Sequence, residues 1–121
     1  MKSIVGDKSY MFAIRIVRLY QHLAENKKEY IIGKQVLKSG TSIGANIEEA
    51  LGALSKKEFI AKVQIAYKEA RETKYWLRIL FDTEYIDQIT FDSIIADCDE
   101  LLKMMVSILK TSKENETHKK R

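Results

Sequence analysis

The sequence contains no proline, only five glycines and a single cysteine among its 121 residues. Proline is the residue that most strongly breaks helices, so its absence leaves long helices uninterrupted. The one cysteine, Cys98, cannot form an intramolecular disulfide and suits a reducing compartment. The composition therefore predicts long helices and a cytoplasmic location.

Long apolar runs are also missing from the sequence. No window of about 18 apolar residues is available to span a membrane, and residues 1–7 do not resemble a signal peptide. Apolar residues make up 45% of the chain, which is enough for one domain with a single core. We expect a soluble single-domain protein that makes no contact with a membrane.

Neither sign of charge dominates the sequence, whose net charge is +4, but the charged residues are unevenly distributed along the chain. Residues 1–40 carry eight Lys/Arg and three acids, and residues 41–81 carry seven and five. Residues 82–121 carry six and nine. This division either steers an anionic partner to one side or attracts antiparallel helices to one another, and both interpretations stay open.

The spacing of apolar residues predicts four helices. The first covers residues 8–25 with Asp7 as its N-cap, and the second covers residues 29–53. The third begins at a capping box formed by Ser55 and Glu58 and ends near residue 81. Thr90 is the expected cap of the fourth helix, which ends near residue 111.

Strand signals are absent, and short connections between long helices place neighbours antiparallel. The predicted fold is therefore all-α, an antiparallel up-down-up-down four-helix bundle over residues 1–111. Apolar residues vanish after residue 111, so residues 112–121 are expected to be a disordered tail. The predicted core contains Ile43, Ile47, Phe59, Val63, Ala70, Leu77, Leu101 and Met105.

The segment 39–50 places two glycines and several small polar residues in the middle of the second helix. Glycine, serine, threonine and asparagine are all poor interior helix residues, so this segment needs a compensating reason. Either its hydroxyl groups face a ligand, or they bond helix carbonyls while Gly40 and Gly44 admit another helix closely. We favour the second interpretation and expect Gly44 at a close helix contact, although a break near Gly40 is an alternative.

A basic face on the third helix is the best candidate for binding. Lysine and arginine there would neutralise phosphates, and Tyr75 would stack on an exposed base. Two arginines of the first helix extend this surface if that helix lies alongside. The candidate nucleic-acid-binding residues are Arg15, Arg18, Lys57, Lys68, Arg71, Lys74 and Arg78. An ordinary solvated helix face explains the same pattern.

No catalytic motif is visible, so we do not expect an enzyme. Glu48 and Glu49 with Glu69 and Glu72 suggest a carboxylate cluster, but di-metal bundles also need Glu-x-x-His pairs, which the sequence lacks. Cys98 lies on an apolar stripe and is expected to be buried and inert. We predict no catalytic residues, no metal site and no cofactor.

One stretch of the chain, from residue 9 to residue 80, resembles the four-helix-bundle family of 23S rRNA intervening-sequence proteins. The matching residues are Gln35, the whole segment 39–50, Ser55, Phe59, Lys62, Ile65, Ala66, Lys68, Glu69, Ala70, Glu72, Thr73, Tyr75, Trp76 and Leu77. The apolar run from Leu101 fits the family's more variable last helix.

The resemblance implies a small bacterial protein that assembles into a homopentamer. Many members are encoded within insertions of large-subunit rRNA genes. Similar bundles act as accessory proteins of diversity-generating retroelements, where they partner a reverse transcriptase and bind nucleic acid. Two functions stay open for this chain: an oligomer that binds RNA or DNA, and a scaffold that organises a protein such as a reverse transcriptase.

Overall fold

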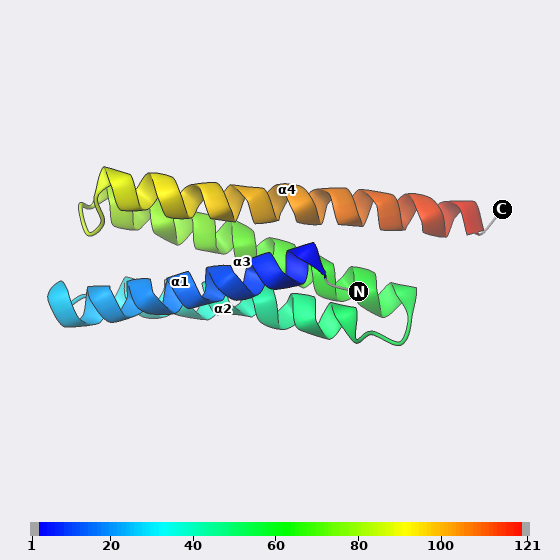
Figure 1. Ribbon diagram of the computed structural model, residues 1–121, viewed down its shortest axis with the longest axis horizontal. Coiled ribbons are helices and arrows are strands. Elements are labelled where there is room, and N and C mark those ends of the chain that lie inside the picture. The colour runs from blue at the N-terminus through cyan, green and yellow to red at the C-terminus, as the bar shows by residue number, and fades with distance from the viewer. Residues whose placement is uncertain (1–2, 120–121) are drawn as a thin grey trace.

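The computed structural model describes residues 3–119, with side chains placed for residues 3–115. Four helices make up the fold: α1 (Ile4–Asn26), α2 (Ile31–Leu51), α3 (Lys56–Asp82) and α4 (Gln88–Lys119). Consecutive helices run in opposite directions and are joined by short connections (Figure 1). The predicted all-α, up-down-up-down bundle is confirmed.

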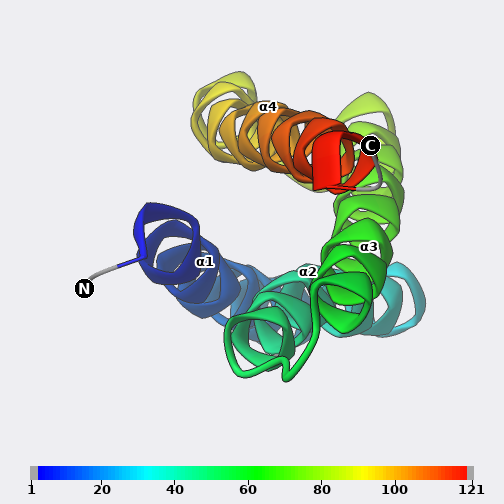
Figure 2. The ribbon, with the colours of Figure 1, turned by 90° about the vertical axis from the view of Figure 1, so that its right-hand side faces the viewer.

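The helices pack in chain order, so that α2 contacts α1 and α3, and α4 contacts α3. Seen end-on, the four helices follow an arc, and α1 and α4 stand at its two ends (Figure 2). The α1–α4 contact that closes the arc is the sparsest of the four, and α1 and α3 are not adjacent, since none of their Cα atoms lie within 8 Å of one another.

The core lies inside this arc and is lined by one apolar stripe from each helix. Seven of the eight predicted core residues are buried, and Phe59 is partly buried against them. Thr73 is fully buried among the apolar residues of α3, where its hydroxyl bonds the Ser39 hydroxyl of α2 at 2.9 Å.

Three predicted helix starts need correction. Helix α1 begins one turn before Asp7: Ser3 is the cap, its hydroxyl accepting the Gly6 N–H at 3.1 Å, because Val5 already belongs to the buried stripe. Helix α4 begins before Thr90, because the Asp87 carboxylate accepts the Thr90 N–H at 2.8 Å.

Helix α2 begins at Ile31, later than predicted, because the buried Glu29 carboxylate accepts three backbone N–H groups of its first turn. It then runs without interruption to Leu51, so the alternative of a break near Gly40 is wrong. The predicted cap of α3 is confirmed, because the Ser55 hydroxyl accepts the Glu58 N–H at 3.1 Å. The reciprocal bond is shifted by one residue: the Glu58 carboxylate accepts the N–H of Leu54, before the cap, at 3.3 Å.

Helix α4 continues to Lys119 and extends past the other helices at its C-terminal end (Figure 1). The predicted end near residue 111 is therefore too early, and Ser112 beyond it is buried. Residues 120–121, the end of the predicted disordered tail, lie outside the described residues.

Close contacts explain the glycines of α2. A Cβ atom at Gly40 would lie 2.7 Å from Cγ1 of Ile16 in α1, and one at Gly44 would lie 3.2 Å from the backbone oxygen of Ser9. Gly44 therefore sits at a close helix–helix contact, as predicted. The same contact requires Gly40 even more strictly, because the β-branched Ile16 is stiff close to its backbone.

Candidate nucleic-acid interface

Four ion pairs join different helices in the described part of the chain. They are Lys8–Glu100 at 2.9 Å, Arg15–Asp97 at 2.6 Å, Lys62–Glu49 at 3.0 Å and Lys74–Asp99 at 2.7 Å. Arg15 also donates to the Ser93 hydroxyl at 3.0 Å. Two predicted binding residues, Arg15 and Lys74, thus hold α4 against its two neighbours.

The two arginines of α1 lie apart from the cations of α3. Because α1 does not lie alongside α3, its arginines do not extend the charged surface of α3. Arg18 is exposed and lines a hollow of about 320 Å³ between α1 and α4, together with Arg15 and His22. The predicted set of seven residues therefore divides into two separate groups.

The remaining four predicted residues project from the outer side of α3. Lys57, Lys68, Arg71 and Arg78 are all exposed. None of them makes an ion pair with another residue in the part of the chain that the structure describes. Their charges are therefore available to an external anion.

A groove between α3 and α4 adds two cations that the sequence analysis missed. The groove has a volume of about 370 Å³. We call it the α3–α4 groove, and its lining residues are Tyr67, Arg71, Leu102, Lys103, Val106, Ser107 and Lys110. Lys103 and Lys110, like Arg71, form no ion pair with any described residue.

A signal for these lysines was present in the sequence. Residues 82–100 contain seven acids and no lysine or arginine, whereas residues 101–113 contain three lysines and no acid. Averaging the charge over residues 82–121 hid this reversal. The acidic half of α4 supplies ion pairs to α1 and α3, and the basic half lines the groove.

A second surface of α3 has the opposite charge. It consists of Ile65, Glu69, Glu72 and Trp76, and we call it the aromatic–acidic face. The Trp76 indole donates to the Glu72 carboxylate at 3.1 Å. Burial raises the pKa of Glu69, and the nearby Glu72 raises it further, while Lys38 acts in the opposite direction. Neither glutamate has an ion-pair partner among the described residues.

The small polar residues of α2 are occupied by internal hydrogen bonds. Thr41 donates to the Leu37 carbonyl at 2.8 Å, Ser42 to the Lys38 carbonyl at 2.6 Å and the Asn46 amide to the Ser42 carbonyl at 2.8 Å. Ser39 accepts from Thr73 and donates weakly to the Val36 carbonyl. The favoured interpretation of this segment, internal bonding with close helix packing, is confirmed.

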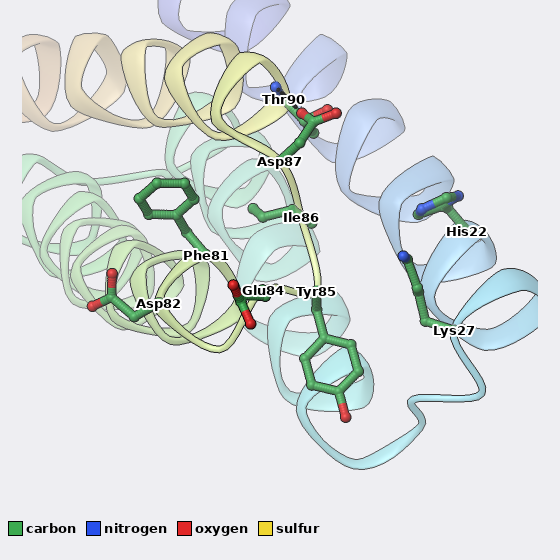
Figure 3. A pocket seen from close by; sticks show the side chains of 9 residues that line it. All are labelled: His22, Lys27, Phe81, Asp82, Glu84, Tyr85, Ile86, Asp87 and Thr90. Atoms are coloured by element: carbon green, nitrogen blue, oxygen red, sulfur yellow. Dashed lines mark hydrogen bonds between the residues drawn. The ribbon is translucent and has the colours of Figure 1, made fainter.

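A hollow of about 790 Å³ lies where the C-terminal end of α1 faces the α3–α4 connection. His22 on α1 and Lys27, the residue that follows α1, lie across from Tyr85, Ile86 and Asp87 (Figure 3). The Thr90 backbone N–H lowers the pKa of Asp87, and the charges of His22 and Lys27 lower it further. Asp87 is thus already engaged as the cap of α4. The lining also contains Asp82 and Glu84, so its acids outnumber its cations and it does not suit a phosphate.

Cys98 lies in the core with its thiol 3.5 Å from the Ala70 carbonyl oxygen. Burial raises the pKa of this thiol to about 12, so it stays protonated at neutral pH, as expected of an inert core cysteine. Among the described residues, no group of three or more His, Cys, Asp or Glu side chains is arranged to hold a metal ion. Within the same residues, no helix has a long enough apolar stretch to cross a bilayer.

Comparison with known proteins places this bundle in a family. The family model of the 23S rRNA-intervening sequence protein matches residues 1–107. The chain belongs to this family. No curated protein matches the chain.

A similar solved structure is that of a protein of unknown function from the S23 ribosomal protein family of Bacteroides thetaiotaomicron. It shares 52% sequence identity with this chain and superimposes with a TM-score of 0.87. The match covers 88% of this chain and 99% of the other. The resemblance read from residues 9–80 is therefore confirmed, and the shared fold extends into α4.

Proposed function

We propose that this intervening-sequence protein is a non-catalytic oligomer that binds nucleic acid through the outer side of α3 and the basic half of α4. The observation that carries the proposal is the α3–α4 groove, where Arg71 lies with Lys103 and Lys110 and none of the three is neutralised by a described residue. Lys57, Lys68 and Arg78 extend the same charged surface along α3. Such a surface attracts phosphates without reading base sequence.

Oligomerisation is part of the proposal. The aromatic–acidic face leaves Ile65 42% exposed, and the partly buried Trp76 lies on the same side of α3 about three turns further along. Burial of such side chains is typical of protein interfaces. Trp76 and Arg71 are five residues apart, which separates them by roughly 140° around a helix. A second copy bound at the aromatic–acidic face would therefore leave the α3–α4 groove open, and repetition of the groove would raise affinity by avidity.

The number of copies follows the family resemblance, which implies five. Light scattering at micromolar concentration should give about five times the protomer mass of 14.0 kDa. A particle of the protomer mass would contradict the oligomer. Binding of cellular RNA or DNA also requires the cytoplasmic location that the composition predicts, and we retain it as part of the proposal.

The charge proposal is tested by reversing three charges in the groove. Arg71→Glu, Lys103→Glu and Lys110→Glu together should abolish gel shifts of RNA and DNA near 50 mM salt, a range in which phosphate contacts dominate affinity. The matched control reverses three exposed lysines at the α1–α2 end of the molecule, Lys27, Lys28 and Lys34. This control has the same net charge and should still bind.

The second candidate function is a scaffold for a protein partner such as a reverse transcriptase. The aromatic–acidic face favours it, because its two unpaired glutamates suit a basic partner. If the parent protein shifts neither single-stranded nor double-stranded RNA or DNA, nucleic-acid binding is refuted and the scaffold becomes the better proposal.

A further inference from the structure

We infer that the α3–α4 groove takes single-stranded nucleic acid in preference to a duplex. This inference rests on the proposed nucleic-acid binding and concerns the same site. It comes from the combination of an apolar floor and a cationic rim in one groove. Tyr67, Leu102 and Val106 supply the floor, and Arg71, Lys103 and Lys110 supply the cations.

The floor of the groove is accessible although it is apolar. Val106 is 50% exposed, while Tyr67 and Leu102 are partly buried against the core. The bases of a duplex are stacked inside it, so a duplex presents mainly phosphates and sugars to a shallow groove. Burying this floor under phosphates would bring no apolar contact to offset the lost hydration of the phosphates.

A single strand satisfies both parts of the groove. Its unstacked bases offer flat apolar faces, which bind well to aromatic and aliphatic side chains, while its phosphates reach the cations. The volume of about 370 Å³ lies at the lower end of the range of small-ligand pockets and admits flat groups such as bases. Because Arg71, Lys103 and Lys110 line the same groove as the floor, we expect one strand to make base and phosphate contacts there at the same time.

The structure also assigns the aromatic contact to a different tyrosine from the one the sequence suggests. Tyr75 is exposed but lies outside the groove, with its ring against Trp76 at a centroid distance of 5.0 Å. Tyr67, two turns earlier on α3, lines the groove. The pair therefore provides one test residue and one matched control of the same type on the same helix.

The experiment measures fluorescence anisotropy of a labelled, unstructured oligonucleotide and of the duplex that it forms with its complement. Both titrations use the whole protein at one low salt concentration. The parent should bind the single strand about tenfold more tightly than the duplex, which corresponds to roughly one base–aromatic contact. Tyr67→Leu, which keeps an apolar side chain against the core, should remove most of this preference.

Two further variants separate stacking from general packing. Val106→Ser should weaken single-strand binding severalfold and leave duplex binding unchanged, because it makes only the floor more polar. Tyr75→Leu should change neither affinity. Circular dichroism melting of each variant shows whether the bundle is intact.

The outcomes distinguish this inference from the proposed function. Equal affinity for both forms, lost in the Arg71, Lys103 and Lys110 charge-reversal variant, would overturn the single-strand inference and keep the proposed function. Absence of binding to either form would overturn both. An unchanged preference in folded Tyr67→Leu and Val106→Ser would also overturn the inference.

Discussion

Along the α1–α2 contact the two backbones approach each other through glycines, whereas along the α1–α4 contact the helices are joined by charged side chains. Gly40 leaves no room for a Cβ beside Ile16, and a Cβ at Gly44 would be tight against the backbone of Ser9. By contrast, the ion pairs of Lys8 and Arg15 span the α1–α4 contact, with hollows of about 250 and 320 Å³ beside them.

This comparison teaches how stability is distributed in the bundle. Close apolar packing depends on volume, so a single methyl group matters there. Exposed ion pairs contribute little and are screened by salt. We therefore expect α1, α2 and α3 to form the most stable part of the molecule, and the α1–α4 contact to be its least stable helix contact.

The largest expected effect comes from placing a charge in the core of the most stable part, formed by α1, α2 and α3. Val63→Asp would bury a carboxylate without a partner at a residue that is 1% exposed, and should destabilise the fold by several kcal/mol. The control is Ala61→Asp on the exposed side of α3, which introduces the same residue type into the same helix. Urea unfolding followed by circular dichroism measures both, and equal losses would contradict the core assignment.

Addition of one methyl group at the α1–α2 contact should have the next largest effect. Gly40→Ala gains roughly 1 kcal/mol in helix propensity but overpacks Ile16, which typically costs about 1–3 kcal/mol. A net loss of about 1 kcal/mol is expected.

Gly52→Ala serves as the control for Gly40→Ala, because a Cβ there meets no atom closer than 3.8 Å. This control should be neutral or slightly stabilising. A melting temperature of Gly40→Ala above that of the parent would refute the tight contact at Gly40.

Removal of a charge at the α1–α4 contact should have a smaller effect. Arg15→Gln loses the ion pair with Asp97. Because the Arg15 side chain is 35% exposed and that of Asp97 is 47% exposed, this loss should cost less than about 1 kcal/mol of stability. A double-mutant cycle with Asp97→Asn isolates the coupling between the two. That coupling should shrink in 1 M salt, where the screening length is about 3 Å. A coupling that is large and independent of salt would contradict the expectation that the α1–α4 ion pairs contribute little to stability.

The smallest effect concerns pH at the cap of α4, where Asp87 faces the end of α1. The folded-state pKa of Asp87 is lowered below 3.8 by the Thr90 N–H and by His22 and Lys27, so ionised Asp87 stabilises the fold above its unfolded-state pKa. This stabilisation is lost as pH falls through the folded-state pKa. The parent should be slightly more stable than Asp87→Asn near neutral pH, and the difference should vanish in strong acid. A difference that is unchanged between the two conditions would argue against the charge interaction.

Several features of the molecule could be read from the sequence because they depend on local spacing. The period of apolar residues identifies four helices and most of the core, including Val63 and Leu77. The cap at Ser55 and the close contact at Gly44 were likewise visible in residue type alone. The start of α1 was misplaced, because an aspartate and a serine are equally good caps and only packing of Val5 chooses between them.

The sequence by itself determined the fold class and the glycine contact, because helical period and small residues act within or between neighbouring turns. It also identified the family, through the residues that match the family's pattern. Only the tertiary structure decided which cations are free. Arg15 and Lys74 look identical to Arg71 in a charge pattern, yet α4 places acids beside the first two and lysines beside the third. That choice depends on which helix lies next to which, and residues far apart in the chain set it through the packing of the core.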